Sequence, residues 1–452
     1  MRDSASPFWT VMNRTFLTVA LVLALAGPSP GLAQAPPEAL PPAGGLELPA
    51  LLDSVALRNP RLQAVTASAE AAASRVPEAS TLPDPMFQLG VMNFGLPDFN
   101  TDMVNSMAPS VQLMQTLPFP GKLGLRGEIA EASMEMARVG AAETWWLIRD
   151  ETAARFYELY ALDRQVEVQR ETLGFLRDFQ TVARSLYASG EGRQADVLRA
   201  DVEVARMDGE IRRMEARRTA LAARINGLLD QPADRPVPSP VLPELPAAVP
   251  DQDTLRTWAW ESRPALERSR LAVDQADTRV ALAHKDIWPN LTLGVSYGRR
   301  DMGLGTEHMG SAMVGFSIPI FASRRQMAAR EEAEAMKRVN QADLAGLRSE
   351  VDARIGELLA ELERSRSLIE LYEGEVLPQA SAMVGSARSS YRVGAVDFMT
   401  LVDAQLTVNR YELELYQLQA DYGRAVSGLE AVVGRPLPKT PSSLAAASET
   451  TR

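Results

Sequence analysis

Hydrophobic and polar residues alternate with a period of two in four short stretches of the chain and follow helical spacing over most of the rest. In the clearest alternating stretch, Leu291, Leu293, Val295 and Tyr297 point to one side of a strand, and small or polar residues point to the other. Each stretch is about ten residues long, which suits a tilted strand that crosses a bilayer. The alternation predicts strands at about 85–95, 108–118, 289–300 and 309–320.

Helical spacing predicts two kinds of helix. A first helix is expected from Glu47 to Leu82, before Pro83 and Pro85, with a counterpart from Asp251 to Trp288. After each strand pair, apolar residues recur at three- and four-residue steps over about 65 residues, which corresponds to a rod of about 100 Å. Each rod should turn near a glycine and return as a second helix. The expected pairs are Lys122–Tyr187 with Arg193–Leu229 and Ser323–Tyr391 with Val396–Val433.

These elements occur twice, and corresponding residues lie 204 positions apart, as in Leu51 and Leu255 or Tyr187 and Tyr391. We therefore expect an internal duplication of a helix, a strand hairpin and a long helical hairpin. Seven prolines separate the two copies and exclude a helix between them. The expected division is an export signal at 1–33, a Pro-rich lead segment at 34–46, repeats at 47–231 and 251–438, a Pro-rich linker at 232–250, and a flexible tail at 439–452.

One repeat position carries two weak helix formers. Pro378 lies inside the second long helix, where proline costs about 3 kcal/mol and kinks the axis. Its counterpart in the first copy is Gly174. The pair predicts a bend in both long helices, with coincidence as the alternative.

The first residues have the pattern of an export signal. Arg2 and Arg14 precede an apolar run of eleven residues, Phe16–Ala26, and a small-residue site ends at Ala33, after which we expect cleavage. The alternative, a transmembrane anchor, needs about 20 apolar residues. No later stretch is apolar enough for a spanning helix, so a membrane crossing would have to use strands. Because about eight strands is the minimum for a closed barrel, several chains would have to contribute, unless the strands form a soluble sheet.

Composition excludes several kinds of chemistry. The chain has no cysteine, and its two histidines, His284 and His308, fall in different elements, so we expect no metal centre and no cofactor. A net charge of −11 argues against nucleic acid as a partner. No phosphate loop, nucleophile elbow or His–carboxylate pair is present, which predicts that the protein is not an enzyme.

Five segments in this order, duplicated and behind an export signal, resemble the TolC-type outer-membrane efflux proteins. They are Leu-Arg-Asn-Pro-Arg-Leu (57–62), Leu-Pro-Phe-Pro-Gly-Lys (117–122), Ile-Pro-Ile-Phe (318–321), Leu-Pro-Gln-Ala (377–380) and the segment from Tyr391 to Gln405. The resemblance implies a mainly α fold with a small β part, in which three chains form a twelve-strand outer-membrane β-barrel continued by a periplasmic α-barrel. It further implies an exit duct for drugs or heavy-metal cations, with a periplasmic adaptor and an inner-membrane pump, of the RND type, as partners.

The same resemblance implies a gate at the periplasmic tips. Asp403 matches an acidic ring position, whereas Thr400 stands where a second ring aspartate is usual. Tyr391 and Asp196 match a pair that ties neighbouring coils, and Val396 replaces a basic partner, so a looser lock is expected. For each of these acids the alternative is an ordinary solvated carboxylate. The adaptor-docking tips would include Gly190, Gly192, Gly394 and Ala395.

Two questions stay open at this point. Five of the eighteen methionines lie in the first strand hairpin, at 86, 92, 103, 107 and 114, and could bind soft metals or simply fill gaps and face lipid. Asp84-Pro85-Met86 and Pro118–Lys122 resemble ducts of the CusC and CzcC metal-efflux kind. The alternative function is a soluble periplasmic coiled-coil adaptor, although adaptors usually carry one hairpin and many strands.

Overall fold

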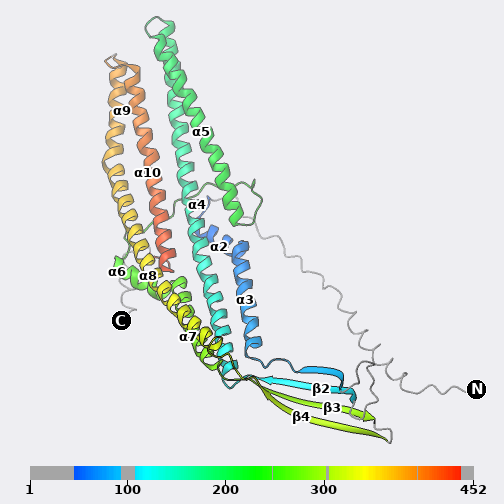
Figure 1. Cartoon of the computed structure of the whole chain (residues 1–452). Helices are drawn as coiled ribbons and strands as arrows, with labels where there is room; N and C mark the ends of the chain where they lie inside the picture. Colours follow the sequence, from blue (N-terminus) through cyan, green and yellow to red (C-terminus); the bar gives the residue numbers. More distant parts are fainter. Residues whose placement is uncertain (1–44, 93–106, 247, 302–304, 394, 439–452) are drawn as a thin grey trace, which may run out of the picture. The chain divides into compact units, whose positions relative to one another are not determined.

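A computed structural model describes residues 45–92, 107–246, 248–301, 305–393 and 395–438 (Figure 1). The predicted export signal, nearly all of the lead segment and the predicted tail lie outside these residues, as do Met103 and Gly394. From Gly45 onward the described residues belong to one structural unit.

Each repeat begins with two helices where one was predicted. The first pair is α2 (Leu48–Arg58) and α3 (Pro60–Ser80), and the second is α6 (Gln252–Ser262) and α7 (Pro264–Lys285). The single long helix was wrong because the residue before a proline is forced out of the helical conformation. Asn59 is extended at this point, and its side chain accepts from the backbone N–H groups of Arg61 and Leu62 to start the next helix.

The four strands form one antiparallel sheet in the order β1-β2-β3-β4. They are β1 (Met86–Met92), β2 (Met107–Leu117), β3 (Leu291–Asp301) and β4 (Thr306–Phe316). The pairing of β2 with β3 joins the two repeats, and β1 and β4 are the edges. One face of the sheet carries large apolar side chains that are exposed: Phe87, Leu89, Leu113, Leu291, Leu293, Val295, Tyr297, Val314 and Phe316.

A long helical hairpin follows each strand pair. In the first repeat, α4 (Lys122–Ala188) is continuous and returns as α5 (Gln194–Leu228), which lies alongside it in Figure 1. In the second repeat, α8 (Gln326–Leu371), a π-helical turn η1 (Tyr372–Val376) and α9 (Leu377–Arg392) form the outgoing arm, and α10 (Phe398–Val433) returns. Helix α10 packs against α4 of the other repeat as well as against α8 and α9.

The π-helical turn lies directly before Pro378, which is the second residue of α9. Proline lacks an N–H and its ring crowds the carbonyl four residues earlier, so a widened turn lets the helix pass this residue. At the matching Gly174, α4 continues without such a turn. The distortion is therefore specific to the second repeat.

A buried apolar core lies between α6, α7, α8 and α10, in what we call the equatorial region, and the linker runs beside it. Leu255, Leu266, Ile355 and Leu429 are fully buried and bring α6, α7, α8 and α10 together. The Pro-rich linker runs in extended form and pairs with the lead segment, because the N–H of Val241 donates to Leu46 and the N–H of Leu46 donates to Ser239. In the described part of the chain, no helix combines the length and the apolar character that a membrane span requires.

Candidate functional site

The tip between α4 and α5 is a tight reversal that depends on two glycines in different ways. Gly190 has a φ of +80°, a conformation that a side chain disfavours. Gly192 needs space, since a Cβ there would lie 2.8 Å from the backbone nitrogen of Tyr187. Its N–H donates to the carbonyl of Leu186 at 2.9 Å. These two predicted docking residues therefore shape the end of the hairpin.

The second tip is closed by an aspartate that the sequence analysis did not single out. Asp397 caps α10, and its carboxylate accepts from the N–H of Thr400 at 2.9 Å and from the Thr400 hydroxyl at 2.7 Å. Ala395 is exposed, and its N–H donates to the carbonyl of Ser390. Gly394 lies outside the described residues. Thr400, predicted as a weakened ring position, is thus engaged in a helix cap of its own chain.

The charge of Asp196 in the first repeat acts on the phenol of Tyr391 in the second. Burial raises the pKa of the Tyr391 phenol above its ordinary value, and the negative charge of Asp196 raises this pKa further. Tyr391 stands at the end of α9, whereas Asp196 lies in the first turn of α5. The two residues therefore interact electrostatically within one chain, and their role in tying neighbouring coils stays a prediction.

An aromatic cluster surrounds Tyr391. Phe175 and Phe179 of α4 stack edge to face with ring centroids 4.3 Å apart. Phe179 also contacts Tyr391 at 6.4 Å and Phe398 at 5.6 Å, so rings from both hairpins meet. Such pairs add about 0.5–1.5 kcal/mol each beyond their buried area. Leu176, Leu401 and Val402 are buried around them.

Opposite charges face each other beside this cluster. The pKa of Asp397 lies below its ordinary value, first because Thr400 donates hydrogen bonds to it and then because Arg193 and Arg199 lie nearby. Both arginines come from the first repeat, at the positions that match Asp397 and Asp403 of the second. Comparison of residues 204 positions apart could have predicted this pairing, because these two positions are basic in the first hairpin and acidic in the second.

The remaining gate candidates face solvent in the single chain. Asp403 is exposed on α10, and its backbone carbonyl accepts from the hydroxyl of Thr407. Val396 is half-buried. The described residues also hold no group of three His, Asp or Glu side chains arranged to bind a metal ion.

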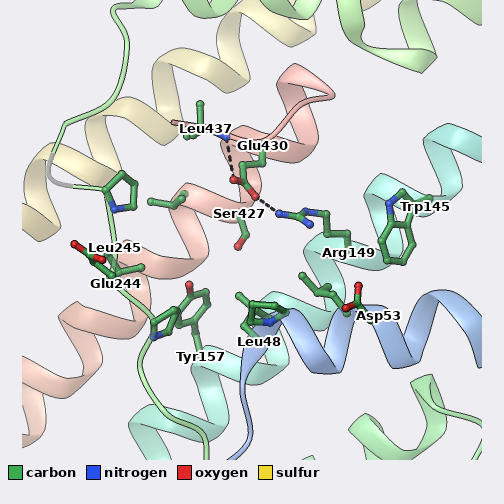
Figure 2. A pocket seen from close by; sticks show the side chains of 15 residues that line it. Leu48, Asp53, Trp145, Arg149, Tyr157, Glu244, Leu245, Ser427, Glu430 and Leu437 are labelled. Atoms are coloured by element: carbon green, nitrogen blue, oxygen red, sulfur yellow. Dashed lines mark hydrogen bonds and ion pairs between the residues drawn. The ribbon is translucent and has the colours of Figure 1, made fainter. Parts of the chain in front are cut away.

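A separate cavity of about 290 Å³ lies in the equatorial region, between α2, α4, the linker and α10. Figure 2 shows Glu430 at its wall, bound to Arg149 at 2.6 Å and to the backbone N–H of Leu437 at 3.0 Å. Tyr157 lines the same cavity, and burial raises the pKa of its phenol. The Arg149–Glu430 pair joins α4 of the first repeat to α10 of the second across this cavity, while Asp53 and Glu244 also line it.

Comparison with known proteins shows the family. A family model described as outer membrane efflux protein matches residues 51–229 and 256–435. The cobalt-zinc-cadmium resistance protein CzcC of Cupriavidus metallidurans is 23% identical over 94% of this chain and 100% of its own length. Among solved structures, the outer membrane protein VceC of Vibrio cholerae superposes with a TM-score of 0.73 at 17% identity, covering 86% of this chain and 96% of VceC.

The MtrE outer membrane channel of Neisseria gonorrhoeae, solved in an open state, gives a TM-score of 0.70 at 14% identity, covering 87% of this chain and 90% of MtrE. These similarities confirm the mainly α, TolC-like fold with its small sheet, and the family model covers both repeats. The chain therefore belongs to the outer membrane efflux protein family.

Proposed function

We propose that this chain is one subunit of a homotrimeric exit duct in the outer membrane, which conducts substrates delivered by a periplasmic adaptor and an inner-membrane pump. The observation that carries the proposal is the sheet, which has two unpaired edges and one exposed apolar face. Its helical hairpins belong in the periplasm.

The edges of the sheet argue for closure by other copies. In a bilayer every backbone N–H and C=O must be paired, so an open sheet cannot persist there. Strand β1 of one copy can pair with β4 of the next, and three copies of a four-stranded sheet give twelve strands. Strands β2, β3 and β4 have 11 residues each, which is enough to cross a bilayer at a tilt.

The two faces of the sheet support the same arrangement. The exposed apolar face suits contact with lipid acyl chains. The opposite face carries Gln88, Gln112, Ser296 and Ser311 and suits a water-filled lumen. A soluble adaptor would leave this apolar face in water, which is why we favour the duct over the alternative.

The tips are the proposed gate and docking surface. We propose that Asp403 forms a carboxylate ring around the trimer axis, that Tyr391 and Asp196 tie the coils, and that Gly190, Gly192, Gly394 and Ala395 shape the surface that meets the adaptor. The exposure of Asp403 and the electrostatic effect of Asp196 on Tyr391 support these roles. The pump, which we propose is of the RND type, supplies the energy.

Heavy-metal cations are the cargo that we favour, because the CzcC relative is a cobalt-zinc-cadmium resistance protein and aligns over nearly the whole chain. Drugs are the second candidate. Conduction through the duct is passive, and we propose no catalytic step.

Deletion of the gene for this protein in its native host tests the proposal. We expect greater sensitivity to cobalt, zinc and cadmium salts, restored by re-expression. The protein should fractionate with outer membranes and require detergent for extraction, whereas recovery in a buffer-soluble periplasmic fraction would support the adaptor instead.

A further inference from the structure

Four methionines of the sheet, Met86, Met114, Met309 and Met313, share one face. Residues directly opposite each other in an antiparallel sheet share a face. Met86 lies opposite Met114, Met114 opposite Gly294, and Gly294 opposite Met313, so these four residues form one row across all four strands. Met309 lies on the same face, opposite Gly298. This is the polar face, which the proposed function places toward the lumen.

This distribution is not what gap filling predicts. On the lipid-type face, the large apolar side chains that the structure describes are Phe, Leu, Val and Tyr. On the polar face, the large apolar side chains that the structure describes are all methionines, set among Gln, Ser, Thr and Gly. A need for apolar bulk alone would be met by valine or isoleucine, which favour strands. Sulfur is the property that separates the two sets.

Gly294 brings the sulfur-bearing side chains together. A Cβ at this position would lie 2.7 Å from Cγ and 3.1 Å from Sδ of Met313, and 3.5 Å from Cγ of Met114. The side chains of Met114 and Met313 therefore approach from the two flanking strands into the space that a side chain at Gly294 would fill. Glycine weakens a strand, so its place here agrees with a close approach of neighbours.

The sulfur lone pairs of the row are available to a ligand on the polar face. The side-chain amide of Gln112 crosses from β2 and donates to Sδ of Met313 at 3.3 Å. Gln88 donates to Sδ of Met86 at 3.2 Å. Met86 and Met313 are exposed and Met114 is half-buried. Each thioether therefore holds only a weak, exchangeable hydrogen bond or none, which a cation can replace.

We propose that Met86, Met114 and Met313, which we name the thioether row, bind soft monovalent cations such as Cu⁺ and Ag⁺. Thioethers select such ions over Zn²⁺ and Co²⁺, which prefer nitrogen and oxygen ligands. The row lies near the start of β3, where the strands receive the chain from the helices. The inference rests on the proposed function only for the direction of transport.

Binding of Ag⁺ to the purified, detergent-solubilised protein tests the row directly. Titration calorimetry in nitrate buffer, which avoids silver chloride, would compare the wild type with the triple variant Met86→Leu/Met114→Leu/Met313→Leu. Leucine keeps the volume and removes the sulfur. We expect at least about a tenfold loss of Ag⁺ affinity and no Zn²⁺ binding in either protein. The matched control, Met327→Leu/Met336→Leu on α8, should bind Ag⁺ as the wild type does.

A second variant keeps every sulfur. Gly294→Val fills the space over which Met114 and Met313 meet, and Gly315→Val adds the same side chain on the same face at an open position. Ag⁺ affinity should fall in the first variant and stay unchanged in the second, with equal melting temperatures showing that both fold. Wild-type Ag⁺ affinity in the triple variant would overturn the proposal. If that variant also still restored cobalt resistance, the exit-duct function would stand while the thioether row failed.

Discussion

The ammonium group of Lys122 donates a hydrogen bond of 2.7 Å to the backbone carbonyl of Trp288, and this contact joins the first repeat to the second where helices meet the sheet. The same ammonium lies 3.2 Å from the side-chain oxygen of Asn290 and 3.2 Å from the carboxylate of Asp286. The Lys122 side chain is only 4% exposed. A buried charge with three partners fixes the angle between α4 and β3.

Replacing Lys122 with methionine should therefore be costly. Lys122→Met leaves the carbonyl of Trp288 and the side-chain oxygen of Asn290 without their donor in a part-buried site, and we expect the free energy of unfolding to fall by about 1–3 kcal/mol. Lys337→Met is the control, because its ion pair with Asp277 is substantially exposed and should contribute less than about 1 kcal/mol. Denaturant titration followed by circular dichroism measures both, and equal losses would show that Lys122 is not a special contact.

Substitution by alanine should lower the stability of the protein at Gly190 and raise it at Gly174. Gly190→Ala forces a side chain into a positive φ and should destabilise the α4–α5 tip by about 1 kcal/mol or more. Gly174→Ala lies inside α4 with open space around it and should stabilise the helix by about 0.5–1 kcal/mol. Metal efflux in cells should fall for Gly190→Ala alone, with sheet assembly intact in both. Unchanged efflux in Gly190→Ala would show that adaptor docking does not depend on the shape of this tip.

Ionisation of Tyr391 should loosen the tip at high pH. The pKa of this phenol is raised above 10.0, so the stability it provides is complete below pH 10.0 and is lost as the pH rises through the raised value. Hydrogen exchange of the amides from Ala387 to Tyr391 should accelerate above about pH 10 more in the wild type than in Tyr391→Phe, which cannot ionise. The same acceleration in both proteins would assign the effect to another group.

Asp397 should stabilise the second tip only while it is ionised. Its pKa is lowered, so its contribution is present above pH 3.8 and is lost as the pH falls through the lower folded value. At neutral pH, Asp397→Ala should speed exchange of the Thr400 amide, whereas Asp397→Asn keeps a capping oxygen and should have a smaller effect. The difference between wild type and Asp397→Ala should vanish in strong acid, and persistence there would refute the charge-based explanation.

Asp403→Ala should raise single-channel conductance and lower cation preference in a planar bilayer, because a ring of three carboxylates attracts cations at a narrow place. A moderate effect is expected, since Thr400 supplies no second acidic ring and Val396 no basic partner. Glu370→Ala, an exposed acid on α8, is the control. Identical current and selectivity in Asp403→Ala and wild type would make Asp403 an ordinary solvated carboxylate.

The parts of the fold that depend on periodicity were predictable from sequence, and those that depend on distant packing were not. The alternation around Leu293 and the duplication at Tyr187 and Tyr391 indicated the strands and hairpins. The break at Asn59 was missed although Pro60 signalled it. The buried Lys122 had no sequence signal beyond its motif, because its partners lie more than 160 residues away.

The candidate site shows the same division. The family resemblance singled out Tyr391 and Asp196, and the charge of Asp196 raises the pKa of Tyr391. The cluster of Phe175, Phe179 and Phe398 needs the packing of two hairpins, which no local pattern in one helix reveals.

Closure of the sheet by three copies is the central claim, and disulfide trapping measures it most directly because the chain has no native cysteine. Within one chain, β1 and β4 are three strand spacings apart, about 14 Å, which is too far for a disulfide. Oxidation of outer membranes that carry Gln88→Cys together with Ser311→Cys or Gly315→Cys should yield covalent trimers in at least one pair, and each single variant none. Light scattering should give a trimer mass for the solubilised protein. A monomer or dimer mass, with no covalent trimer from either pair, would contradict the proposed duct.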